Sequence, residues 1–205
     1  NNMLAIKYLA GDHKVAFMNS YQKASLYSFY SKSEGFSLNN IMGRKNQFDI
    51  WNVEDTYRGQ NILMIPNYDI KEFNHIQGIS KTIRYTFIEN FQSFSAIKIA
   101  AIGLRKEANQ ADTLNIELTL TNTKKKDIDL SANPNYPSYL YYLFFEGRVL
   151  IKEEKGFKIT NEILDKDLNL DVIMPDKKGN YGVYFTIKTG WLPPTINSQR
   201  YDIRN

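Results

Sequence analysis

Amide, hydroxyl and aromatic side chains gather after the first apolar stretches of the chain. Asn19, Ser20, Tyr21 and Gln22 follow one such stretch, Asn39 and Asn40 follow another, and RKNQFDIW occupies residues 44–51. Amides bond sugar hydroxyls as paired donors and acceptors, and aromatic rings cover the apolar face of a pyranose. The candidate ligand-binding residues are therefore Asn19, Tyr21, Gln22, Asn46, Gln47 and Trp51.

The same residues also have structural explanations. Ser20 is well placed to cap a following helix, and Asn19 has a side chain that suits a turn. Trp51 is large and apolar enough to lie in a core. The sequence leaves the binding and the structural interpretations open.

Motifs for other chemistry are absent. Neither a G-x-G-x-x-G stretch nor a P-loop follows the first strand, and there is no G-x-S-x-G. His13 and His75 stand in polar, loop-like contexts that favour surface positions. The carboxylates of Glu54 and Asp55, adjacent in sequence, point apart on a helix or strand, and the same holds for residues 153–154. No catalytic residue and no cofactor is expected.

One stretch has the alternating oxygen ligands of a calcium loop. Its oxygens would come from Asp165, Asp167, Asn169 and Asp171. The sixth position of such a loop requires glycine for a sharp turn, but Leu170 stands there. The apolar residues between the carboxylates alternate as in a strand, so no metal site is expected.

The elements that would position the candidate residues are strands and a helix. Residues 14–19, 36–39 and 62–65 are short apolar runs, and continuous apolar runs are typical of strands buried in a parallel sheet. A helix through residues 25–31, capped by Ser20, and a second helix at 48–57 are expected between them. This order predicts a small three-layered α/β unit with a short parallel sheet. Ligands bind such sheets beyond the carboxyl ends of the strands.

After about residue 80 the apolar residues alternate with polar ones. The alternation covers residues 83–87, 114–120 and 181–187, with turn sequences at 133–137, 146–147 and 176–180. Such strands predict an antiparallel β-sandwich. The fold class is thus α+β, with an α/β unit at 1–75 and a sandwich at 76–205.

Composition bounds the partners. The 205 residues have a formal net charge of +4 with scattered basic residues, so no nucleic-acid partner is expected. There is no cysteine, and no apolar stretch approaches the ~20 residues of a membrane helix.

The opening Asn1-Asn2-Met3 suggests a fragment of a longer protein. In the segment GWLPPTIN, Trp191 is expected to act as a staple between the two parts.

A family resemblance is carried by four stretches of the sequence: residues 14–55, Gly59, ILMIP and GWLPPTIN. Residues 14–55 read KVAFMNSYQKASLYSFYSKSEGFSLNNIMGRKNQFDIWNVED. They resemble the C-terminal region of bacterial membrane glycosyltransferases of the protein O-mannosyltransferase and aminoarabinose transferase family. The resemblance covers most of the chain.

The resemblance implies a parent protein with many membrane helices and a polyprenyl-phosphate sugar donor. Catalysis in that family relies on an acidic residue in a loop near the parent's N-terminus, which has no counterpart here. The chain would then be an inactive accessory domain at the periplasmic face of the inner membrane. Its partners would be the membrane-embedded remainder of the parent and a glycan or lipid-linked sugar acceptor.

Two alternatives remain. A carbohydrate-binding module of a secreted protein would carry an exposed aromatic platform, drawn from Tyr136, Tyr139, Tyr141, Tyr142 or Trp191. A protein-interaction module would bind no small ligand at all. A hydrolase is disfavoured because no pair of nucleophile and base is visible.

Overall fold

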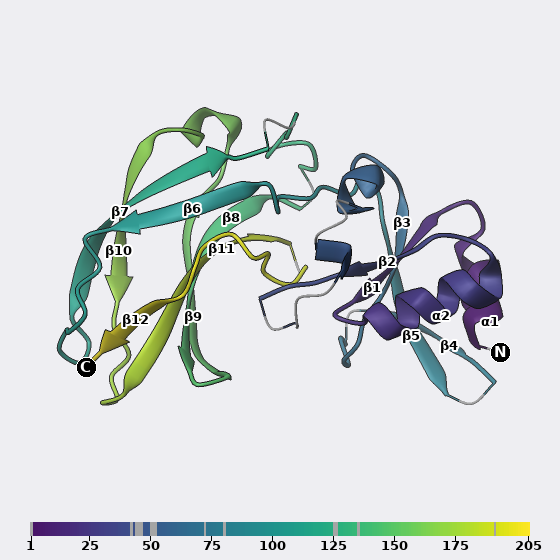
Figure 1. Cartoon of the computed structure of the whole chain (residues 1–205), viewed down its shortest axis with the longest axis horizontal. Coiled ribbons are helices and arrows are strands. Elements are labelled where there is room, and N and C mark those ends of the chain that lie inside the picture. The colour runs from purple at the N-terminus through teal and green to yellow at the C-terminus, as the bar shows by residue number, and fades with distance from the viewer. Residues whose placement is uncertain are drawn as a thin grey trace. The chain divides into compact units, whose positions relative to one another are not determined.

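The computed structural model describes residues 2–41, 43, 47–49, 53–71, 73–79, 81–124, 127–134, 136–190 and 192–205. The chain divides into two compact units, residues 1–93 and 94–205 (Figure 1). Most of the regular structure is β, arranged in one five-stranded, one three-stranded and one four-stranded sheet.

The first unit is built on a mixed sheet of order β2-β1-β3-β5-β4. Strands β1 (Lys14–Met18), β2 (Gly35–Leu38) and β3 (Ile62–Ile65) run parallel, which confirms the predicted short parallel sheet. Strand β5 (Thr82–Ile88) is antiparallel to β3, and β4 (Asn74–Gln77) pairs with its outer edge. Because β1 and its neighbours are covered on both faces, their residues are apolar almost throughout.

Two α-helices cover one face of this sheet. Helix α1 (Asn2–Ala10), which the sequence reasoning did not anticipate, contacts α2 (Tyr21–Ser31). Ile6 of α1 and Ala24 and Tyr27 of α2 share a core cluster with Phe17 of β1. Helix α2 approaches β2 so closely that any side chain at Gly35 would overlap the Ala24 carbonyl oxygen, which explains the glycine.

The opposite face of the sheet meets short 3₁₀ helices. Side chains alternate along a strand, so Phe36, the register neighbour of Ala16, faces away from the helix-facing Phe17. Its ring contacts Phe48 in η1 (Gln47–Asp49) and Tyr57 in η2 (Val53–Tyr57). The expected single helix at 48–57 is therefore wrong for the described residues, and residues 50–52 lie outside them.

The first unit extends further along the chain than the boundary expected at residues 75–76. The alternating stretch at Ile83 and Tyr85 belongs to β5, which pairs with β3 and so continues the first sheet. Ile83 also packs into the same cluster as the helices. The two units divide between Ser93 and Phe94.

The second unit is a β-rich, sandwich-like fold of antiparallel strands. One sheet has the order β10-β7-β6, from Asp167–Ile173, Thr113–Asn122 and Ile97–Ile102. The other has the order β12-β11-β8-β9, from Tyr201–Arg204, Asn180–Thr189, Ser138–Glu146 and Val149–Lys158, while Asn161–Ile163 forms the 3₁₀ helix η3. Both sheets contribute alternate residues to one core, which confirms the predicted antiparallel pattern.

A buried asparagine fastens the segment after β11 to the start of this unit. The Asn197 side-chain amide nitrogen donates to the carbonyl oxygens of Phe94 and Ile97, both at 2.9 Å. Its side-chain oxygen accepts from the Ile187 backbone N–H at 2.8 Å. One amide thus joins the segment at Phe94 and Ile97 to β11, about 90 residues further along the chain.

Candidate functional site

The carboxyl ends of the three parallel strands bring together four asparagines. Asn19 follows β1, Asn39 and Asn40 follow β2, and Asn67 follows β3. The connection from β1 leads to β2 on one side, whereas the connection from β2 leads to β3 on the other. The β1–β3 boundary is therefore a topological switch point, the place where open α/β sheets bind ligands.

The Asn19 side chain is engaged within the protein. Its amide nitrogen donates to Asn40 Oδ1, and its oxygen accepts from the Asn40 backbone N–H, both at 2.9 Å. The Asn19 backbone has a φ of +48°, a left-handed conformation that asparagine tolerates better than most residues. A Cβ atom at Gly43 would overlap Asn19 Oδ1, so the glycine makes room for this amide pair.

A second amide pairing ties the end of β2 to η1. The buried Asn39 accepts from Ser37 Oγ at 3.1 Å and donates to Asp49 Oδ2 at 2.7 Å. The sequence places Asn39 and Asn40 in an amide-rich stretch, but only the structure shows that they hold the loops together. A structural role therefore explains the amides nearest to the sheet.

The remaining described candidates are accessible. Tyr21 and Gln22 lie exposed in the first turn of α2, and Gln47 is exposed in η1. Asn46 and Trp51 lie outside the described residues. Ser20 occupies the N-cap position as predicted, although its side chain makes no capping hydrogen bond.

Sequence reasoning missed a lysine at this edge. Lys23 Nζ donates to Asn67 Oδ1 at 3.0 Å, which links the first turn of α2 to the end of β3. Burial, together with the nearby positive charge of Lys81, lowers the pKa of Lys23. The position of Asn67 could have indicated this contact from the sequence, because Asn67 follows an apolar strand just as Asn19 does.

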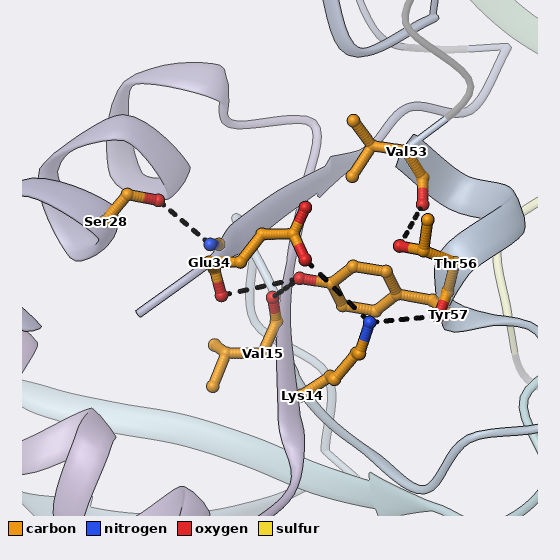
Figure 2. Close-up of polar contacts among 8 residues, drawn as sticks. Lys14, Val15, Ser28, Glu34, Val53, Thr56 and Tyr57 are labelled. Carbon is orange, nitrogen blue, oxygen red and sulfur yellow. Dashed lines mark hydrogen bonds and ion pairs between the residues drawn. The ribbon is translucent and has the colours of Figure 1, made fainter. Parts of the chain in front are cut away.

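The amino ends of the same strands form a contrasting polar cluster (Figure 2). Tyr57 is fully buried, and its hydroxyl lies 3.3 Å from the Val15 carbonyl oxygen and 3.4 Å from that of Glu34. Lys14 Nζ lies 4.8 Å from the centre of the Tyr57 ring and donates to the Thr56 carbonyl oxygen at 3.0 Å. Burial raises the pKa of Tyr57 above the ordinary value.

The polar groups of this cluster bond to one another and to nearby backbone carbonyl groups. The Glu34 carboxylate lies 3.8 Å from Lys14 Nζ, and the Thr56 hydroxyl donates to the Val53 carbonyl oxygen at 2.8 Å (Figure 2). Carbonyl oxygens, a carboxylate and a ring therefore surround the lysine and the phenol. We assign the cluster to anchoring η2 at the amino ends of β1 and β2.

The sandwich tyrosines are not arranged as an open platform. Tyr142 is buried in the core, while Tyr139 and Tyr141 are half-exposed on the other side of β8. Lys155 Nζ lies 3.4 Å from the centre of the Tyr139 ring, and Lys188 Nζ lies 5.1 Å from that of Tyr141. Because ammonium groups already occupy these ring faces, sugar stacking there would have to displace them. Trp191 lies outside the described residues.

The carboxylates with calcium-loop spacing lie on or beside β10. Asp167 accepts from Thr119 Oγ1 at 2.8 Å, and Asp171 accepts from Asn115 Nδ2 at 3.0 Å, both across the ladder to β7. Among the described residues, no group of three or more histidine, aspartate or glutamate side chains could hold a metal ion.

Comparison with known proteins adds no relative. No protein-family model matches the sequence, and no curated protein matches it. Within the described parts of the chain, every helix is too short or too polar to cross a bilayer.

Proposed function

We propose that the chain is an accessory domain of a polyprenyl-phosphate-sugar-dependent membrane glycosyltransferase, located at the periplasmic face of the inner membrane. Its catalytic loop lies elsewhere in the parent protein. The domain supports the membrane-embedded active site and contacts the glycan or lipid-linked sugar acceptor. In this proposal the first unit is a three-layered α/β unit, with the 3₁₀ segments as its third layer.

The observation that carries the proposal is the polar edge at the switch point of the first sheet. It presents Tyr21, Gln22 and Gln47 to solvent beside an internally bonded amide network. Amide groups can bond sugar hydroxyls and a phenol ring can cover the apolar face of a sugar, whereas the turn Asn19-Ser20-Tyr21-Gln22 after β1 has none of the glycines that let a backbone approach a pyrophosphate. The sequence resemblance of residues 14–55 to the transferase family supports the same conclusion.

The decisive experiment is sugar transfer by the full-length parent in membranes. Tyr21→Ala combined with Gln22→Ala is expected to lower the transfer rate about tenfold, a loss of roughly 1.4 kcal/mol of transition-state binding. Gln60→Ala is the matched control, because Gln60 is also an exposed glutamine but precedes β3 at the opposite end of the strands. Equal transfer by the double variant and the wild type would reject the contact residues.

The assignment to a membrane transferase has a separate test. The native open reading frame is expected to encode many apolar spans ahead of these residues. A gene that encodes no such spans would reject the transferase proposal as a whole, whatever the domain binds.

A further inference from the structure

The outward side of the two helices of the first unit is rich in exposed apolar side chains. Leu4 and Tyr8 lie one turn apart on α1, and Leu26, Phe29 and Tyr30 share one side of α2. Tyr8 is 87% exposed and Phe29 is 64% exposed. Both helices pack on the same face of the sheet and contact each other, and these five residues, termed here the helical face, lie on their outward sides.

Basic side chains accompany this surface. Lys32 Nζ lies 4.8 Å from the centre of the Phe29 ring, and the Phe29 and Tyr30 rings meet edge to face at 5.1 Å. Lys7 Nζ donates to the Ser31 carbonyl oxygen at 2.6 Å, which ties α1 to the end of α2. The helices and their basic groups are thus joined into one patch.

Acidic residues are scarce around the helical face. Residues 1–33 contain four lysines and a single acidic residue, Asp12. At the chain's average of 22 acidic residues in 205, a stretch of this length would hold about three or four. Of the four lysines, Lys14 pairs with the Glu34 carboxylate and Lys23 bonds Asn67, so the patch combines its apolar side chains with Lys7 and Lys32.

The second unit exposes a different kind of apolar residue. Its exposed large apolar side chains, among the described residues, are aliphatic and lie on strands: Ile102, Val149, Leu150, Ile151 and Ile173. The most exposed aromatic residues that the structure describes belong to the first unit, whereas Tyr139 and Tyr141 of the second are half-exposed with a lysine over each ring. Strong aromatic exposure is hence a feature of the first unit.

We propose that the helical face binds the surface of a bilayer that contains anionic lipid. Tyrosine and phenylalanine rings settle at the depth of the lipid headgroups, and lysines near them gain from the negative surface potential. At 9 and 11 residues, α1 and α2 would lie along the interface with one side immersed. This inference does not depend on the assignment to a glycosyltransferase.

Vesicle flotation with the 205-residue chain tests the proposal. The protein is expected to float with mixed phosphatidylcholine–phosphatidylglycerol vesicles and to be released as salt screens the attraction. Tyr8→Ser combined with Phe29→Ser should weaken the partitioning about tenfold, since two exposed rings would leave the interface. Lys32→Gln should weaken it about fivefold on anionic vesicles alone.

The matched control is Val149→Ser with Ile151→Ser, which removes two exposed apolar side chains from β9. This control should float like the wild type. Because the substituted side chains are exposed, all variants should keep the wild-type circular dichroism spectrum and unfolding temperature.

Three outcomes would overturn the proposal. One is failure of the wild-type protein to float with anionic vesicles, and another is flotation that ignores both salt and phosphatidylglycerol. The third is a dimer in sedimentation velocity that Phe29→Ser dissociates, which would make a second copy of the chain the occupant of the helical face.

Discussion

The two ends of the parallel strands in the first unit are both polar, yet they differ in what their polar groups contact. At the amino ends, Lys14 and Tyr57 are surrounded by carbonyl oxygens and a carboxylate. At the carboxyl ends, Asn19 and Asn39 bond to neighbouring loops while Tyr21 and Gln22 remain exposed. The amino ends are called here the closed end, because their polar groups bond within the protein. At the carboxyl ends, the bonded Asn19 and Asn39 are called the inner row, and the exposed Tyr21 and Gln22 are called the outer row.

The difference shows that residue type alone does not separate a site from a scaffold. An asparagine whose amide is already paired loses those bonds if it turns to a ligand, so its net gain from binding is small. An exposed glutamine or tyrosine exchanges water for ligand at little structural cost. Function at the carboxyl ends should therefore depend on the outer row, and stability on the inner row and on the amino ends.

The largest expected effect is at the amino ends. Tyr57→Ala should lower the free energy of unfolding by about 3–5 kcal/mol, because it empties a fully buried aromatic site beside Phe36. Tyr57→Phe keeps the ring and should cost only about 1 kcal/mol. Urea denaturation of both variants measures the difference, and equal losses would contradict the packing role of the ring.

A smaller effect is expected in the inner row of the carboxyl ends. Gly43→Ala should cost about 1–3 kcal/mol, because the added Cβ displaces the Asn19 side chain from Asn40. The same denaturation experiment measures it. If Gly43→Ala were as stable as the wild type, the amide pair would not hold these loops.

Alkaline pH should remove the stability that the buried Tyr57 hydroxyl gives to the closed end. Burial holds the pKa of Tyr57 above the 10.0 of an exposed tyrosine, so the folded state keeps a proton that the unfolded state loses. Stability from this group is present below pH 10 and is lost as the pH rises above it, by up to ~1.4 kcal/mol per pH unit. Tyr57→Phe should show a shallower decline in unfolding free energy between about pH 9 and 11, roughly one unit either side of the pKa of an exposed tyrosine.

The smallest effect on stability is expected in the outer row. Tyr21→Ala and Gln22→Ala should each change the free energy of unfolding by less than about 0.5 kcal/mol, because both side chains are exposed. Thermal unfolding followed by circular dichroism measures this. A loss above that size would mean that the outer row also belongs to the scaffold.

Much of the fold could be predicted from the periodicity of the sequence. Continuous apolar runs gave the parallel strands, and alternation gave the antiparallel core at residues such as Ile116 and Phe185. Helix α1 was missed because apolar residues occur on all its sides, with Leu4 exposed and Ile6 buried, so that no helical period stands out in its sequence. The helix expected at 48–57 failed because an apolar pattern does not distinguish α from 3₁₀ geometry.

The candidate site was only partly predictable. The amide stretches were visible, but the pairing of Asn19 with Asn40 depends on two strands lying side by side. The same holds for Lys23 and Asn67, which are 44 residues apart. A single sequence shows the residues of such pairs but does not show which of them lie close together. The distinction between the inner and the outer row therefore required the structure.

The Asn197 amide has a consequence for biosynthesis. Its bonds to Phe94 and Ile97 span 103 and 100 residues, and Ile203 of β12 completes the same core. On the ribosome, the second unit therefore cannot close until its whole length has emerged. Until then its incomplete β-sheets would expose apolar surface to which chaperones bind, because distant strands pair late.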